Sequence, residues 1–415
     1  MILEKYSFGV GDRFSHQGKA QLQAFIKAKG QGVDITPVWN KSHREHTIIK
    51  TTHASVRKEA DDAVSDLNWT GPYLVDADHI GLKNVDLFID SSDFFTLDVA
   101  DFIGQAVDEG DVKSFVEKYK KYVGELAIEG IDEPLVLSEE KITEIAKKYL
   151  LAVKEAGKIY RHVEAKKGAD NFITEVSMDE TDSPQTPIEM IFILAAIADE
   201  GIPAQTIAPK FTGRFNKGVD YVGDVEQFAK EFNDDLAVIA FAVKEFGLKK
   251  NLKLSVHSGS DKFSIYKPIN HALKKFDAGL HIKTAGTTWL EELIGLAMAG
   301  GDGLEIAGCI YTGALSRFDE LCGPYATVID IDKDKLPTPD EVNSYSGEQF
   351  ADALRHNQSC EKYNLNLRQL LHVGYKIAAE MGDDYYNALE KYEGIIARNV
   401  TENIYERHIK PIFIQ

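Results

Sequence analysis

The chain is poor in cysteine and has no long hydrophobic run. It holds three cysteines in 415 residues, Cys309, Cys322 and Cys360. An odd and sparse set without metal-ligand spacing excludes a disulfide framework and a cysteine-based zinc motif. The most apolar segment, residues 187–198, is too short to span a bilayer. We therefore expect a protein of a reducing compartment that has no membrane partner.

Basic residues are also in short supply. The chain has 47 Lys and Arg against 66 Asp and Glu, which gives a formal net charge of −19. Such a field repels phosphate backbones, so we expect no nucleic-acid partner. Residues 1–5 run directly into a strand pattern and do not resemble a signal peptide. These features predict a cytoplasmic protein that acts on a small molecule, and they leave a homo-oligomer open.

What the sequence does contain is a repeating order of strand, polar loop and amphipathic helix. Eight strands that alternate with helices predict a closed parallel (β/α)8 TIM barrel, an α/β fold, rather than an open sheet. The predicted strands span residues 6–12, 34–39, 73–79, 94–99, 171–180, 205–211, 252–259 and 280–284.

Two regions depart from this order. Residues 108–168 have an almost entirely helical pattern, which predicts a helical insertion that covers the barrel mouth or pairs subunits. Residues 301–415 are also mainly helical. We therefore expect a barrel over residues 1–300 that includes the insertion, and a C-terminal region over 301–415 that packs on the barrel.

Carboxylates and histidines predominate where the predicted strands end. In a TIM barrel these ends meet at one mouth, where the active site lies. Imidazole and carboxylate together suit Zn, Mn, Co, Ni or Fe, so we expect a divalent metal cation assembled from several strands. The strand-end residues are Asp12, Arg13, Asn40, Ser42, His43, Asp76, Asp78, His79, Thr96, Asp98, Asp179, Glu180, Lys210, His257, His281 and Lys283.

Three of these residues are the expected metal ligands: His79, Glu180 and His257. Glu180 is preferred over Asp179 because neighbouring strand residues point to opposite faces, and because a carboxylate after an apolar strand needs a partner. The alternative for His79 is a cap that bonds its own loop. Which of Asp76, Asp78 and Asp98 faces the metal stays open at this point.

Two loops rich in small residues follow the last two strands, at 258–260 and 285–287. Their backbone amides, with Lys262, Lys283 and the Thr284 hydroxyl, could bind a carboxylate or phosphate. Lys210 and Lys283 lie on strands, so each could be a nucleophile, a general base or an anion clamp, or form a buried ion pair. The remaining candidates for substrate contact are Ser42, Thr96 and Ser258.

The chain resembles the tagaturonate epimerase family at these residues. The matching segments are 8–13, 76–79, 95–98, 177–181, 217–221, 257–264, 281–287 and 367–373. The resemblance implies a metal-dependent barrel that acts on a ketouronate. It places His79, Glu180 and His257 near the metal, and the loops of Lys262 and Lys283 near the substrate carboxylate.

The activity implied is interconversion of tagaturonate and fructuronate. These sugars differ at a carbon β to the ketone, which favours retro-aldol cleavage and re-addition over simple proton exchange. Glu180, Asp78 and Lys210 are the candidate acid–base groups. The alternatives are a related metal-dependent ketose or sugar-acid epimerase, an isomerase or a class II-type aldolase, and, outside catalysis, a sugar-acid sensor.

Overall fold

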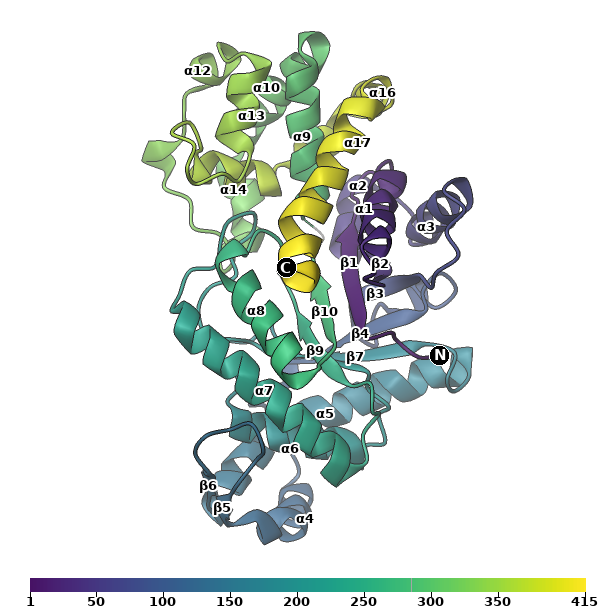
Figure 1. The fold of residues 1–415 in the computed structure, drawn as a ribbon, viewed down its shortest axis with the longest axis vertical. Coiled ribbons are helices and arrows are strands. Elements are labelled where there is room, and N and C mark those ends of the chain that lie inside the picture. The colour runs from purple at the N-terminus through teal and green to yellow at the C-terminus, as the bar shows by residue number, and fades with distance from the viewer. Residues whose placement is uncertain (285) are drawn as a thin grey trace.

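The computed structural model describes residues 1–284 and 286–415. Within this part of the chain, eight parallel strands close into a barrel in the order β1-β10-β9-β8-β7-β4-β3-β2 (Figure 1). The predicted TIM barrel is therefore confirmed. Its strands are β1 (Tyr6–Gly11), β2 (Thr36–Asn40), β3 (Leu74–Ile80), β4 (Phe94–Asp98), β7 (Ile173–Ser177), β8 (Thr206–Ala208), β9 (Lys253–Val256) and β10 (Leu280–Lys283).

Helices connect most of these strands and form the outer layer. Capping residues set where they begin: Thr186 and Glu189 form a capping box with Pro187 in the first turn of one helix. Ser42 and Glu45 form another capping box, at the start of the helix that begins at His43. The helices are α1 (Gly18–Gly30), α2 (His43–Ile49), α3 (Ala54–Asp66), α5 (Glu139–Lys167), α6 (Pro187–Asp199), α7 (Val225–Phe246), α8 (Phe263–Phe276) and α9 (Thr287–Ala299), with short 3-10 turns η1 (Val85–Leu87) and η2 (Ala100–Phe102) before and after β4.

The region predicted as a helical insertion contains more than helices. Between α4 (Glu109–Tyr119) with its 3-10 turn η3 (Lys120–Tyr122) and α5 lies an antiparallel hairpin of β5 (Gly124–Leu126) and β6 (Leu135–Leu137). The prediction of an almost entirely helical segment is wrong there, because three-residue strands are too short to show an alternating pattern. The long α5 follows the hairpin and leads into β7, so it takes the place of a barrel helix.

The chain after α9 forms a helical region at the end of the molecule opposite α4 (Figure 1). Its last segments return to the barrel, where α17 contacts α1 and α9, and η6 contacts α1 and α8. The elements are α10 (Gly301–Ser316), α11 (Phe318–Cys322), η4 (Gly323–Tyr325), η5 (Lys333–Lys335), α12 (Pro339–Asn343), α13 (Gly347–Leu354), α14 (Leu365–Val373), α15 (Tyr375–Met381), α16 (Asp383–Lys391), α17 (Glu393–Glu402) and the π-helix η6 (Asn403–Ile414).

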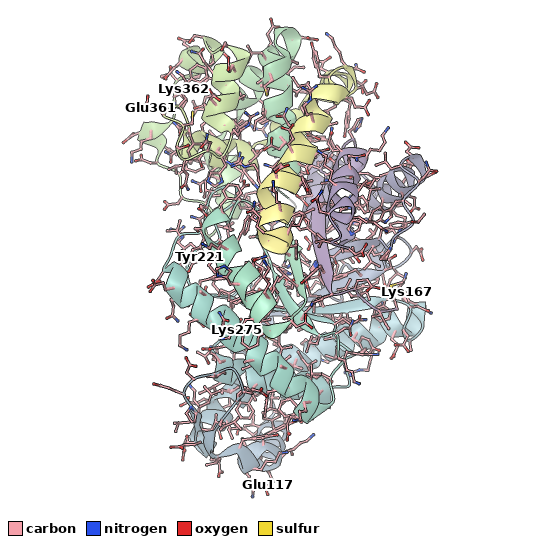
Figure 2. The ribbon with its side chains drawn as sticks, viewed as in Figure 1. Glu117, Lys167, Tyr221, Lys275, Glu361 and Lys362 are labelled. Carbon is pink, nitrogen blue, oxygen red and sulfur yellow. The ribbon has the colours of Figure 1, made fainter. Side chains whose placement is uncertain are left out.

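The outer surface carries the charged side chains, such as the exposed Glu117, Lys275 and Glu361 (Figure 2). Among the described residues, none of the helices combines the length and apolar character that crossing a membrane requires.

Candidate active site at the barrel mouth

Inward-facing side chains fill the barrel in two layers of opposite character. The lower layer is apolar and consists of Leu3, Val38, Leu74, Phe94 and Ile173. Side chains alternate along a strand, so the residue two positions after an inward one also faces inward. At those next positions the layer turns polar while staying buried, with Asn40, Asp76, Thr96 and Glu175.

Lys283 of β10 is the centre of the polar layer. Its Nζ donates to Asp76 Oδ2 at 2.7 Å and to Asp78 Oδ1 at 2.8 Å. It also lies 2.6 Å from Thr96 Oγ1 and 3.2 Å from Glu175 Oε1. Burial alone would lower the pKa of Lys283, but the three carboxylates outweigh burial and raise it well above its usual value. Lys283 is therefore a buried ion-pair partner, because a Schiff-base nucleophile or a general base needs a neutral amine.

The two aspartates that share Lys283 differ in their titration. Burial, together with the nearby negative charge of Asp78, raises the pKa of Asp76 to about 7. Burial would also raise that of Asp78, but Lys283 and His79 outweigh it and hold the pKa of Asp78 at about 2. Asp78 is thus an ionised carboxylate at the mouth, whereas Asp76 below it can hold a proton near neutral pH.

Above this network two histidines face each other across the mouth, with ring centroids 5.1 Å apart. His79 Nδ1 lies 3.3 Å from Asp98 Oδ2. His257 Nε2 lies 2.7 Å from Glu175 Oε1, and its Nδ1 lies 2.9 Å from Asp179 Oδ1. Burial would lower the pKa of both rings, but the facing carboxylates raise that of His79 to about 10 and that of His257 to about 9.

These side chains form two overlapping groups of possible metal ligands. In each group, one donor atom per residue lies within 4.8 Å of the others: His79, Asp179 and His257 in one, and His79, Asp98 and Glu180 in the other. His257 Nδ1 is buried, and Asp179 Oδ1 at 2.9 Å is its partner in an ion pair rather than in a well-directed hydrogen bond. A buried polar atom normally has a partner, and imidazole with carboxylate is a donor set for a divalent cation. The residues present therefore fit the metal expected from the sequence.

An irregularity in β3 brings Asp78 and His79 to the mouth together. Strict alternation would place these neighbours on opposite faces of the sheet. The register of β3 against β4 shifts between Ala77 and Ile80, and His79 adopts a left-handed φ of 51°. A bulge of this kind re-aims a side chain, so both residues can face the same space.

The alternation argument that chose Glu180 over Asp179 does not separate the two residues in the structure. β7 ends at Ser177, so the alternation argument does not extend to the two acidic residues. Both reach the mouth: Asp179 faces His257, and the exposed Glu180 joins His79. Sequence reasoning also missed Glu175, the buried partner of both His257 and Lys283. Its signal was a carboxylate at an inward position of an apolar strand.

Other sequence candidates have their polar atoms occupied elsewhere. Ser42 caps α2, and Thr284 Oγ1 donates to the Gly9 carbonyl at 2.9 Å. Lys210 Nζ donates to the Thr181 carbonyl. Lys262 Nζ donates to three backbone carbonyls, those of Asn216, Val219 and Ser260, at 2.9, 2.7 and 2.8 Å.

The structure describes the first of the two small-residue loops completely and the second only in part. Ser258 follows His257 directly, is half-buried and has a left-handed φ of 49°. In the loop after β10, position 285 lies outside the described residues. The structure thus brings together His79, Glu180, His257, Asp78, Thr96 and Lys283, whereas the polar side-chain atoms of Ser42, Lys210, Lys262 and Thr284 are bonded to groups outside this cluster.

The whole length of the chain matches one known family. A family model for tagaturonate epimerase covers residues 1–412. This chain belongs to the tagaturonate epimerase family. It is accordingly an enzyme of the isomerase class, a carbohydrate epimerase.

Relatives of this epimerase include a tagaturonate/fructuronate epimerase of Thermotoga maritima. The two are 28% identical over 419 residues, which cover 97% of this chain and 80% of the relative. A glycerol-complexed crystal structure of fructuronate-tagaturonate epimerase from Cohnella laeviribosi is similar, with a TM-score of 0.81 and 23% identity over 99% of this chain and 82% of that one. The native structure of the same protein gives a TM-score of 0.79 over 99% and 82%. These crystal structures support the fold.

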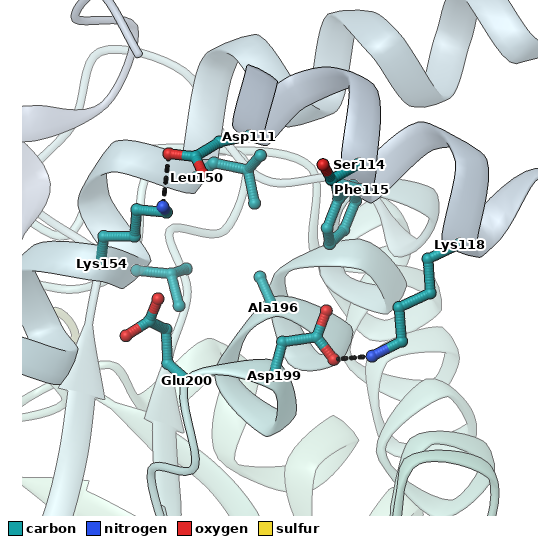
Figure 3. Close-up of a pocket in the computed structure, with 10 residues that line it drawn as sticks. Asp111, Ser114, Phe115, Lys118, Leu150, Lys154, Ala196, Asp199 and Glu200 are labelled. Atoms are coloured by element: carbon teal, nitrogen blue, oxygen red, sulfur yellow. Dashed lines mark hydrogen bonds and ion pairs between the residues drawn. The ribbon is translucent and has the colours of Figure 1, made fainter. Parts of the chain in front are cut away.

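A cavity of about 170 Å³ lies away from the mouth of this epimerase, between α4, α5 and α6 (Figure 3). Its lining includes Phe115, and its charged residues pair with one another. Lys118 lies 2.5 Å from Asp199, and Lys154 pairs with Asp111. Since these charges are already neutralised, the barrel mouth is the better candidate for the chemistry.

Proposed function

We propose that this chain interconverts tagaturonate and fructuronate with a divalent cation bound at the barrel mouth. The observation that carries the proposal is the convergence of His79, His257 and Asp179, each of which offers one donor atom within 4.8 Å of the others. Glu180 lies with His79 and Asp98 in the second group and is a further candidate ligand. The names of the relatives support the substrate pair, and Zn, Mn, Co, Ni and Fe all suit these ligands.

The reaction poses a specific chemical problem. The two sugars differ at a carbon β to the ketone, and enolisation does not acidify the C–H bond there. Retro-aldol cleavage avoids the problem because it breaks the C–C bond between the α and β carbons and leaves the β C–H bond intact. The electron pair of the broken C–C bond passes to the ketone fragment, and the β carbon becomes an aldehyde. Re-addition to the opposite aldehyde face then inverts the centre.

Residues of this chain supply the proton transfers. Asp78 is ionised and fixed in position by Lys283, and in this proposal it accepts the proton of the β hydroxyl and returns it after re-addition. Glu180 is the alternative base, and its exposure makes it less preorganised. A bound cation would supply Lewis-acid stabilisation of the negative charge that develops on the ketone oxygen. Lys210 bonds a backbone carbonyl and is the least supported of the three candidate bases.

Removal of the metal is the first test of this proposal. The protein is treated exhaustively with chelator, dialysed and reloaded with one metal at a time, and tagaturonate conversion is followed by NMR. We expect conversion to stop in the chelated protein and to return on reloading. A chelated protein that keeps its full rate would show that the cation has no role.

Isotopic labelling separates the mechanisms. Tagaturonate that carries deuterium on the β carbon should yield fructuronate with that deuterium retained. An epimerase that acts at the carbon α to the ketone would instead incorporate deuterium from D₂O at that position. Net release of a three-carbon aldehyde fragment would identify the protein as an aldolase.

A further inference from the structure

Asn40 is a buried amide without a partner in the polar layer of the barrel. It is the last residue of β2, and its inward direction follows from Val38, which lies two positions earlier in the apolar layer. Only 2% of Asn40 is exposed, and neither its Nδ2 nor its Oδ1 makes a hydrogen bond.

The amide lies beside Lys283 and at the level of the carboxylates. A Cβ added to Gly9 would lie 3.0 Å from Asn40 Nδ2 and 3.2 Å from Lys283 Cγ, so both side chains border the same space. On the other side, Asn40 is the register partner of Asp76 in β3. The side chain is therefore placed at the floor of the mouth.

The polar neighbours of Asn40 make their hydrogen bonds to other residues. Lys283 donates to Asp76, Asp78 and Thr96. An amide offers two donors and an acceptor, and leaving such a group unpaired in the interior costs about 1–3 kcal/mol. Since no group in residues 1–284 and 286–415 satisfies the amide, we look for its partner outside the chain.

We propose that Asn40 binds a hydroxyl group of the substrate. A hydroxyl both donates and accepts, so it can satisfy Oδ1 and Nδ2 alike. The carboxylate of a sugar acid fits poorly, because Oδ1 and the carboxylate of Asp76 would repel it. Asn40 thus positions the polyhydroxy part of the ligand, and the substrate carboxylate lies on another side of the mouth. This inference rests on the proposed function only for the class of ligand.

A bound water is the rival partner, and Thr36 provides the matched control. Thr36 lies on the same strand, faces the same side as Asn40, is 2% exposed, and has an unpartnered hydroxyl. It lies four residues below Asn40, under the apolar layer. A water that merely fills the barrel should make the two positions respond alike to loss of their polar atoms.

The test compares Asn40→Ala, Asn40→Asp and Thr36→Val with the wild-type protein, all loaded with the same metal. Metal content, thermal stability, tagaturonate binding by calorimetry and steady-state conversion are measured on each. For Asn40→Ala we expect kcat/KM and tagaturonate affinity to fall about tenfold to a hundredfold, with metal content unchanged. Asn40→Asp should lose more, because it adds a charge beside Asp76. Thr36→Val should stay within twofold of wild type.

Each outcome decides the inference. If Asn40→Ala keeps tagaturonate affinity and kcat/KM within twofold, or if Thr36→Val loses as much as Asn40→Ala, the substrate contact is wrong. If wild type binds tagaturonate without converting it, the proposed function fails while the binding comparison still tests Asn40. If wild type neither binds nor converts tagaturonate, both are overturned.

Discussion

Two buried charge clusters lie on either side of the loop after β9, and they differ in how their polar atoms are satisfied. At the junction with the C-terminal helices, Arg368 donates to Asp261 at 3.0 Å, to the Leu354 carbonyl at 2.8 Å and to the Gly218 carbonyl. At the mouth, neither amide atom of Asn40 makes a hydrogen bond to the described residues. The cation of the junction is bonded within the chain, whereas the amide of Asn40 is free to bind a ligand.

The comparison shows that burial and charge do not by themselves identify a site. His257 faces the mouth, but Asp261 and Lys262, four and five residues later, face the junction. Sequence reasoning took this stretch as one anion-binding loop. The structure divides it into a histidine at the mouth, an aspartate that pairs with Arg368 of α14, and a lysine that bonds the carbonyls of Asn216, Val219 and Ser260.

His257→Ala should have the largest effect on the mouth. The variant removes Nδ1, the proposed metal ligand, and Nε2, the partner of Glu175, so we expect one equivalent of metal to be lost and kcat to fall about a thousandfold. His281→Ala is the matched control, because His281 is also buried in the barrel and bonds Ser7 Oγ at 2.9 Å but belongs to neither group of possible metal ligands. Elemental analysis and NMR conversion assays check both variants. If His281→Ala loses as much metal as His257→Ala, the assignment of His257 as a specific metal ligand is wrong.

Arg368→Met should have the largest effect on the junction. Asp261 would be left as a buried charge that faces only His356 at 3.4 Å, and breaking such a pair costs about 3–5 kcal/mol. Chemical denaturation measures the loss. The double variant Arg368→Met with Asp261→Asn should recover part of it, since the buried charge is then gone. A single variant as stable as wild type would contradict the structural role of the pair.

The pH dependence of stability should reveal the ionisation of Asp261 at the junction. Burial would raise the pKa of Asp261, but Arg368 and His356 outweigh it and hold the pKa well below its usual value. The unfolded chain then binds more protons than the native state, so stability is full above about pH 4 and falls as pH drops below it. Denaturation midpoints between pH 2.5 and about 6 should show a shallower acid decline in Asp261→Asn than in wild type. Parallel curves would argue against the depressed pKa.

Ser42→Ala should have the smallest effect. It removes the capping box of α2 and should lower the free energy of unfolding by about 1 kcal/mol. Because the hydroxyl bonds Glu45, we expect KM for tagaturonate to change less than twofold. A KM raised tenfold with unchanged stability would show that Ser42 contacts the substrate, as expected from the sequence.

The sequence predicts the barrel well because alternation and helix periodicity are local. It also identifies His79 and His257, since strand ends converge in a closed barrel. It could not reveal the bulge that turns Asp78 and His79 to one side, or that β7 stops before Asp179. These features depend on backbone geometry rather than residue type.

The pairing of Lys283 with Glu175 could not be predicted for a different reason. These residues lie on β10 and β7, which do not neighbour each other in the barrel. Their contact forms across the interior only when the barrel closes. Sequence reasoning therefore left Lys283 open between a reactive amine and an ion pair, and it overlooked the glutamate.

The most direct test of the mouth as an incomplete site is an anomalous X-ray difference map of the metal-loaded protein. We expect one peak about 2.0–2.2 Å from His257 Nδ1 and from a His79 ring nitrogen, with a carboxylate oxygen of Asp179 or Glu180 at a similar distance. Fully active crystals with no peak between these residues, or with the metal bound elsewhere, would contradict the account.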